Sequence, residues 1–234
     1  MLWGLRPVEP RAAYGLAVDL LRRQIHAGLL LPAEKLPAER QLSDRFGISR
    51  VTLREALRVL ETDEYITVRR GAQGGAFVTD EDRLCELARR RMLRAPAKTM
   101  RVVEFLTVNQ MAAARLACTR RGPAEMKRMR EAVAMMHAAR TAPHRKQAEA
   151  LFLLALGDAT QNPLLARAIE DGLAELFLPY DTPSTSKTGT VALGEFERLL
   201  AALNSEDVDE AEAAMADLHR LLWDAVRRMG KAAA

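Results

Sequence analysis

The segment from Ser49 to Asp63 constrains the fold of this chain more than any other. Its apolar residues recur with the spacing i, i+3, i+4 and i+7, the pattern of a helix with one buried face: Leu53, Ala56, Leu57 and Leu60. Arg50, Arg54 and Arg58 recur every four residues and form a second stripe on the same helix. The segment is therefore predicted to pack one face on a core and to present guanidinium groups on another.

Two further helices are expected before it. Residues 13–27 carry apolar side chains at helical spacing and end before Gly28, a residue type favoured at helix C-termini. A shorter helix opens with the stretch 36–40 and ends at Gly47. Ser49 is a good N-cap for the third helix. Three short helices joined by a tight turn indicate a helix-turn-helix unit.

The next residues predict a small β-hairpin. Two β-type runs, Tyr65–Val68 and Ala76–Val78, flank the glycine-rich stretch 69–75, which carries two arginines. From Asp80 to the C-terminus the pattern is helical, with breaks at proline and glycine. We therefore predict a mainly α protein. It has an N-terminal winged helix-turn-helix (three helices plus a small β-hairpin wing) and a C-terminal all-helical bundle of six or seven helices.

Length and charge set the remaining limits. With 234 residues the chain is long enough for two domains, placed here at 8–80 and 98–230, with a linker helix at 81–97. The net charge of +4 divides equally between residues 1–80 and the remainder. Bulk charge is therefore weak evidence for a nucleic-acid partner, and the argument depends on where individual arginines lie.

The N-terminal end of the third helix is the expected point of DNA contact. In helix-turn-helix proteins this end enters the major groove, where an arginine binds guanine O6 and N7 bidentately. We expect Ser49, Arg50 and Thr52 to contact bases or phosphates there, and Arg40 to contact flanking phosphates. The dipeptide Arg70-Gly71 at the hairpin tip is expected to enter the neighbouring minor groove. An arginine stripe alone is more often a solvated face, so the prediction rests on the whole arrangement.

The stretches 36–42 and 46–57 read LPAERQL and FGISRVTLREAL. Together with the hairpin Arg69–Val78, they resemble the signature of the GntR family of bacterial regulators. The resemblance implies that the residues matching four positions contact operator DNA: Arg40, Arg50, Arg54 and Gly71. It also implies dimers that bind short palindromes. The predicted DNA-binding residues are Arg40, Ser49, Arg50, Thr52, Arg54, Arg70 and Gly71.

Two residues depart from the family pattern. Ala33 and Glu64 stand where the family usually has glycine, Glu64 at the end of the recognition helix. A non-glycine residue at a left-handed helix C-terminus costs on the order of 1 kcal/mol. The turn after the helix is therefore expected to be slightly reshaped, whereas the DNA-facing side is unaffected.

The second half resembles the FCD ligand-binding domain of the FadR-type branch of that family. The match covers nearly all of 81–230 and is carried by Glu104 with 114–117, Phe152 with Asn162-Pro163, and the stretch from Leu199 to Met215. Many FCD members bind a metal through one Asp and three His. Here those positions fall on Glu149, Leu153, Phe196 and Leu218. We therefore expect no metal and no cofactor.

The replaced residues predict a dry, apolar cavity. Leu106 stands where the family often has an arginine that holds a carboxylate effector. The residues expected near the cavity are Leu106, Asn109, Gln110, Arg115, Glu149, Leu153, Phe196 and Leu218. His219 lies one residue past a ligand position, about 100° around the helix, and is expected to face solvent or an interface unless the register shifts. His26, His137 and His144 are expected at the surface or at a boundary.

The predicted function is a sequence-specific DNA-binding transcriptional regulator, a repressor that binds double-stranded operator DNA as a homodimer. Its effector would be an apolar or amphipathic small molecule, and helix 98–121 is the expected dimer surface. Two alternatives stay open: a helical protein-interaction module without operator binding, and a GntR-type regulator with no small-molecule effector. No enzyme motif such as Gly-x-Ser-x-Gly, His-Glu-x-x-His or a Walker A lysine is present.

The location is expected to be cytoplasmic. The N-terminal residues lack the apolar core of a signal peptide, and no run of 18 apolar residues occurs, so no membrane association is expected. Cys85 and Cys118 lack metal-ligand spacing and are expected to be reduced thiols.

Overall fold

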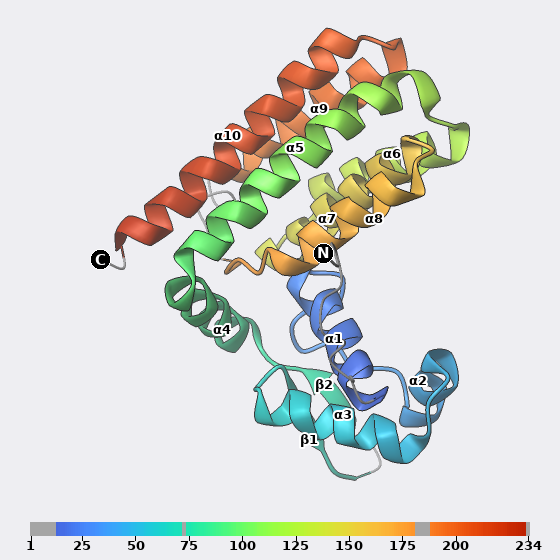
Figure 1. Ribbon diagram of the computed structural model, residues 1–234, viewed down its shortest axis with the longest axis vertical. Helices are drawn as coiled ribbons and strands as arrows, with labels where there is room; N and C mark the ends of the chain where they lie inside the picture. The colour runs from blue at the N-terminus through green and yellow to red at the C-terminus, as the bar shows by residue number, and fades with distance from the viewer. Residues whose placement is uncertain (1–12, 72–73, 181–187, 233–234) are drawn as a thin grey trace, which may run out of the picture.

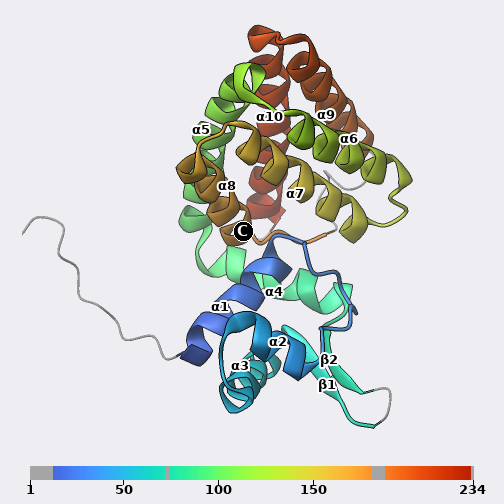
Figure 2. The same ribbon diagram turned by 90° about the vertical axis from the view of Figure 1, so that its right-hand side faces the viewer.

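The computed structural model describes residues 13–71, 74–180 and 188–232, so positions 72–73 of the expected hairpin tip lie outside the described residues. The described chain is mainly α-helical, with a winged helix-turn-helix at one end and a helical bundle at the other (Figures 1 and 2). The predicted fold class is confirmed. The N-terminal elements are α1 (Ala13–His26), α2 (Glu39–Phe46), α3 (Arg50–Thr62), β1 (Ile66–Arg69) and β2 (Gly75–Val78). The later helices are α4 (Glu81–Arg94), α5 (Pro96–Arg120), α6 (Pro123–Ala138), α7 (Ala142–Ala159), α8 (Pro163–Glu175), α9 (Thr188–Ser205) and α10 (Val208–Ala232).

Local sequence accounts for α3 and its surroundings. The Ser49 side chain accepts a hydrogen bond from the Thr52 backbone N–H and caps the helix. Gly47 ends α2 in the left-handed conformation, with φ 65°. The four apolar residues of the α3 stripe are buried and pack against α1: Leu53, Ala56, Leu57 and Leu60.

Helix α2 begins at Glu39, three residues later than the sequence pattern indicated. Ala38 has an extended backbone with ψ 145°, and the Leu36 N–H donates a hydrogen bond to the Ala76 carbonyl of β2. Lys35 also forms a bridge with Phe77. The residues just before α2 therefore extend the wing rather than the helix.

The wing is a two-stranded antiparallel sheet. Its register pairs Ile66 with Val78 and Arg69 with Gly75. Ile66 and Val78 are buried in the N-terminal core, whereas the other residues of β1 are exposed. The inner end of the hairpin is thus fixed by the core, whereas the described residues of β1 beyond Ile66 are exposed.

The bundle is built around α5 and α7. Helix α5 packs along α10 over much of its length and also contacts α7, α8 and α9 (Figure 1). Phe152 of α7 and Phe196 of α9 meet edge to face in its core, with ring centroids 5.0 Å apart. Within the described ranges, no helix has the length and apolar character needed to cross a membrane.

Candidate DNA-binding surface and ligand cavity

The exposed face of α3 carries the predicted arginines. Arg50 and Arg58 are exposed and form no ion pair with any described residue. Arg54 is also exposed, but its Nε donates a hydrogen bond to Glu39 Oε2 at 2.8 Å. Arg40 lies exposed on α2. In this conformation the structure therefore leaves Arg40 and Arg50 open to a phosphate or base, whereas Arg54 is held by a neighbouring helix.

Ser49 and Thr52 are engaged with each other. The Ser49 Oγ accepts from the Thr52 N–H at 3.0 Å and lies 2.8 Å from the Thr52 hydroxyl. Ser49 is exposed and Thr52 is half-buried. These two hydroxyls fix the N-terminus of α3, which places Arg50 at the first helical position.

The outer end of the wing carries Arg70 and Gly71, both exposed. Gly71 has φ 105°, a conformation that side chains rarely adopt. The Arg69 guanidinium lies over the Phe77 ring, 4.5 Å from its centroid. The aromatic ring therefore holds a cation in place on the strand beside the predicted minor-groove residues.

A concave surface of about 610 Å³ lies between the wing and α3. Four cationic residues line it: Lys35, Arg54, Arg58 and Arg69. Sequence reasoning missed Lys35 and Arg69 as members of this surface, and also missed Glu39, which binds Arg54. No local signal indicated them, because Lys35 joins the wing only through the pairing with Phe77.

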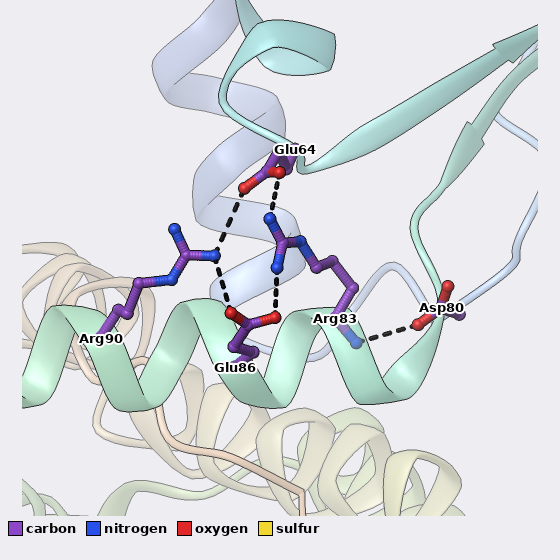
Figure 3. A network of polar contacts seen from close by, with 5 residues as sticks. All are labelled: Glu64, Asp80, Arg83, Glu86 and Arg90. Carbon is purple, nitrogen blue, oxygen red and sulfur yellow. Dashed lines mark hydrogen bonds and ion pairs between the residues drawn. The ribbon is translucent and has the colours of Figure 1, made fainter.

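The end of α3 is tied to the linker helix. Glu64 has φ 66° and Ala33 has φ 60°, so both residues that replace glycine adopt the left-handed conformation. The Glu64 carboxylate pairs with Arg83 and Arg90 of α4, and Glu86 pairs with the same two arginines (Figure 3). The hydrogen bond from Arg83 holds the pKa of Glu64 below its ordinary value. Glu64 therefore supplies a charged contact to α4 that glycine lacks.

A partly open cavity of about 150 Å³ lies in the bundle. Six of the predicted residues line it: Leu106, Gln110, Glu149, Leu153, Phe196 and Leu218. Further apolar lining comes from Leu173, Met215 and Leu222. The cavity is thus mostly apolar, with a few polar groups at its wall.

Two predicted pocket residues lie elsewhere. The Asn109 side chain donates a hydrogen bond to the Phe105 carbonyl of its own helix at 2.7 Å and does not line the cavity. Arg115 has a side chain that is 64% exposed and pairs with Glu212 at 2.8 Å. The expectation for both is wrong because α5 turns Leu106 and Gln110 inward, which places Asn109 and Arg115 on other faces of the helix.

The expectation for His219 is also wrong. This residue is only 4% exposed and lines the cavity beside Leu218. Burial lowers its pKa to about 4. The cavity touches α10 at Met215, Leu218, His219, Leu221 and Leu222. It therefore covers a wide arc of the helix, and a rotation of about 100° still leaves a side chain facing it.

Lys146 and Glu149 of α7 form the charged part of the cavity wall. Burial raises the pKa of Glu149 to about 7 and lowers the pKa of Lys146 to about 8. The Lys146 Nζ donates to the Leu178 carbonyl at 3.2 Å and lies 4.9 Å from the centroid of the Tyr180 ring. Sequence reasoning missed Lys146, which is engaged with the segment after α8.

The segment 176–180 lies between the cavity and the N-terminal core. Leu176 and Leu178 line the cavity, whereas Phe177 and Tyr180 belong to the core formed by α1, α3 and α4. Phe177 stacks on His26, with ring centroids 4.2 Å apart. Adjacent residues of this short segment, the strap, therefore contact both the cavity and the N-terminal core.

His26, expected at the surface or at a boundary, is buried at the junction with the strap and is 2% exposed. Its Nδ1 lies 3.1 Å from the Ala174 carbonyl and its Nε2 lies 2.9 Å from the Tyr65 hydroxyl. A carbonyl only accepts, so Nδ1 carries the proton and the Tyr65 hydroxyl donates to Nε2. His26 thus links α8 to Tyr65, the first residue after the turn that follows α3.

The residues at the FCD metal positions do not fit a metal ion. Leu153, Phe196 and Leu218 have no donor atoms, which leaves Glu149 as the one carboxylate of the pattern. Across residues 13–71, 74–180 and 188–232 there is no group of three or more His, Cys, Asp or Glu side chains placed to hold a metal ion. Cys85 and Cys118 are buried and are not joined in a disulfide.

Comparisons with known proteins agree with these observations. Residues 13–78 match the family described as bacterial regulatory proteins, gntR family, and residues 101–221 match the FCD domain. The HTH-type transcriptional regulator RmpR of Mycobacterium gastri is 29% identical over 83% of this chain and 73% of its own length. The Exu regulon transcriptional regulator of Escherichia coli K12 is 41% identical over 27% of this chain and 25% of its own length.

Solved structures share the fold. Escherichia coli McbR/YncC superimposes with a TM-score of 0.56 at 20% identity, covering 93% of this chain and 98% of that one. Lar of Listeria monocytogenes gives 0.51 at 18% identity, covering 94% and 99%. Because the FCD match alone covers more than half of the residues, the chain belongs to the GntR family of bacterial regulatory proteins, in the branch that carries an FCD domain.

Proposed function

We propose that this protein is a transcriptional repressor that binds a palindromic operator as a homodimer in the cytoplasm, under the control of an effector in the FCD cavity. The observation that carries the proposal is the exposed end of α3, where Arg50 has no ion-pair partner among the described residues. The cationic concave surface between α3 and the wing takes in Arg54 and Arg58 of the same helix. An arginine so placed binds guanine, and the cations beside it bind phosphates.

A palindromic operator requires two recognition helices about one DNA turn apart, which a symmetric dimer supplies. We place the dimer contact on α5, where Phe105 and Val108 are exposed at adjacent turns and Val108 is 66% exposed. Val108→Glu is expected to convert the dimer to a monomer in size-exclusion chromatography with light scattering. A dimer of unchanged mass would place the contact elsewhere.

The strap supports effector control. A molecule in the cavity contacts Leu176 and Leu178, and any displacement of these residues moves Phe177 and Tyr180 within the DNA-binding core. Phe177 contacts His26, which in turn contacts Tyr65 at the end of the α3 turn. An effector regulates only if it binds the two arrangements with different affinity.

The test is fluorescence anisotropy with the intergenic DNA upstream of the gene, at two salt concentrations. We expect a sequence-preferring complex that weakens steeply as salt rises. Arg50→Ala should cost about 1–3 kcal/mol of specific binding, whereas Arg40→Ala should weaken binding evenly across sequences. Arg130→Ala, an exposed arginine on α6, is the control with the same change in charge and should have no effect.

The outcomes separate the alternatives. If no salt-sensitive complex forms, the chain is a helical protein-interaction module and the proposal is wrong. If operator binding occurs but no small molecule that enters the cavity changes it, the protein is a regulator without a small-molecule effector. The operator and effector parts of the proposal therefore fail separately.

A further inference from the structure

The protonation of His219 follows from its contact with α5. The Thr107 hydroxyl donates its single proton to the Val103 carbonyl, at an oxygen-to-oxygen distance of 2.8 Å. The same Thr107 oxygen lies 3.2 Å from His219 Nδ1. Because the hydroxyl proton is already used, the oxygen accepts from His219, and Nδ1 carries the ring proton.

This arrangement leaves a lone pair at the cavity wall. Burial keeps the imidazole neutral at pH 7, since it lowers the pKa of His219 to about 4. In a neutral ring with the proton on Nδ1, Nε2 is an acceptor only. His219 Nε2 is buried and has no hydrogen-bond partner among the described residues. A buried acceptor without a donor is unfavourable, and a ligand that brings a donor relieves this cost.

The cavity also indicates the size and charge of the group that it accommodates. A volume of about 150 Å³ holds a group of about the size of benzene. Leu106, Leu153 and Phe196 supply apolar walls. The Lys146 ammonium donates to the Leu178 carbonyl and lies near the Tyr180 ring, and its charge is offset by Glu149, one turn further along α7. The wall therefore favours an uncharged ligand over an anion.

We propose that the cavity binds a small, uncharged, mainly apolar molecule that carries one hydroxyl or N–H group, which donates a hydrogen bond to His219 Nε2. Phenol and its short alkyl derivatives have this chemistry. The inference rests on the proposed role of the cavity as an effector site. It does not depend on DNA binding, so it is tested on the full chain without DNA.

The experiment compares three para-substituted toluenes by isothermal titration calorimetry: p-cresol and p-xylene, which match in shape, and p-toluate, which is larger by a carboxylate oxygen and carbon. The first donates a hydrogen bond, the second has a methyl group in its place, and the third is an anion. We expect p-cresol to bind about fivefold or more tightly than p-xylene, because only p-cresol satisfies His219 Nε2. We expect p-toluate to bind more weakly than p-cresol, since Lys146 is already offset by Glu149 and the apolar walls do not solvate a carboxylate.

A substitution at His219 tests whether this residue causes the preference for p-cresol over p-xylene. In His219→Phe the advantage of p-cresol over p-xylene should disappear while p-xylene still binds, because the cavity keeps its apolar walls. His144→Phe, at an exposed histidine on α7, should keep the wild-type preference. In the wild type, the 15N resonance of His219 Nε2 should shift on addition of p-cresol and stay in place with p-xylene, which checks the contact without any substitution.

Several results would overturn the inference. They are equal affinities for p-cresol and p-xylene, tighter binding of p-toluate, a preference that survives His219→Phe, or no binding of any probe. Binding of one Zn²⁺ per chain that is lost in His219→Phe would instead assign the nitrogen to a metal. Failure of operator binding would leave all these results unchanged, so the two proposals fail independently.

Discussion

His26 makes folding of this chain depend on pH in a way that the structure specifies. Desolvation, together with Arg91 and other cations nearby, lowers the pKa of the buried imidazole to about 2. In the unfolded chain the ordinary value is about 6.5. Between these two values the unfolded chain binds a proton that the folded chain does not bind. The stability contributed by His26 is therefore complete above pH 6.5 and is lost as the pH falls below it.

The magnitude follows from the linkage relation. Below pH 6.5 the loss approaches about 1.4 kcal/mol for each pH unit, which gives about 2 kcal/mol between pH 7.5 and pH 5.0. His219, with a pKa lowered to about 4, adds a loss of the same sign. Carboxylates with lowered pKa values, such as Glu175, lose their contribution at more acidic pH. Glu149, with a pKa raised to about 7, acts in the opposite sense as the pH falls, so the contribution of His26 is measured as a difference between the wild type and a variant.

The assay is urea denaturation at pH 7.5 and 5.0, followed by circular dichroism. His26→Gln keeps a donor for the Ala174 carbonyl and an acceptor for the Tyr65 hydroxyl but does not titrate. Its free energy of unfolding should fall by about 2 kcal/mol less than that of the wild type over this range. His144→Gln should behave as the wild type, because its ring is exposed in the folded and unfolded chain. The reasoning is refuted if His26→Gln keeps the wild-type pH dependence, or if 15N NMR detects a charged His26 ring in the folded protein at pH 5.0.

Three further predictions concern other parts of the chain. Ala33→Gly should raise the free energy of unfolding, measured by urea denaturation, by up to about 1 kcal/mol. Ala33 has φ 60°, and glycine removes this backbone strain at an entropic cost that is smaller than the strain. A loss of stability would contradict this. Glu39→Gln should release Arg54, tighten operator binding and increase the salt slope by about 0.9, one additional phosphate contact. Glu55→Gln, a neighbouring exposed carboxylate, should leave the slope unchanged. Phe177→Leu should bind operator and p-cresol as the wild type does, yet lose the effect of p-cresol on operator affinity in an anisotropy titration, and an undiminished effect would exclude the strap as the route.

The features that sequence predicted well are those set by local periodicity. The burial of Leu53 and Leu60 on α3 follows from their spacing, because a helix brings such residues to one face whatever surrounds it. The sequence placed Glu64 at a left-handed helix end and predicted a slightly reshaped turn; the residue adopts the ordinary left-handed conformation, with φ 66°. The contact of Glu64 with Arg83 was not, because it joins two helices separated by the wing.

The residues that line the cavity could not be predicted from the periodicity of single helices. Helical rotation assigned His219 to the outside, and Arg115 was expected near the cavity; both assignments are wrong. The packing of α5, α7 and α10 determines how wide an arc of each helix faces the cavity, and a single helix carries no information on that arc. The sequence of the strap also gave no sign that its residues face in two directions. Leu178 and Phe177 are both apolar and both buried, although they face different surroundings.

Selection of bound sequences from a random DNA pool is the measurement that tests the central claim most directly. If α3 and the wing recognise an operator as part of a symmetric dimer, the pool should converge on an inverted repeat whose half-sites lie one helical turn apart. Arg50→Ala, carried through the same selection, should lose the preference at one base position in each half-site. A wild-type pool that shows no enriched sequence, or an enriched sequence that Arg50→Ala selects equally well, would contradict the account.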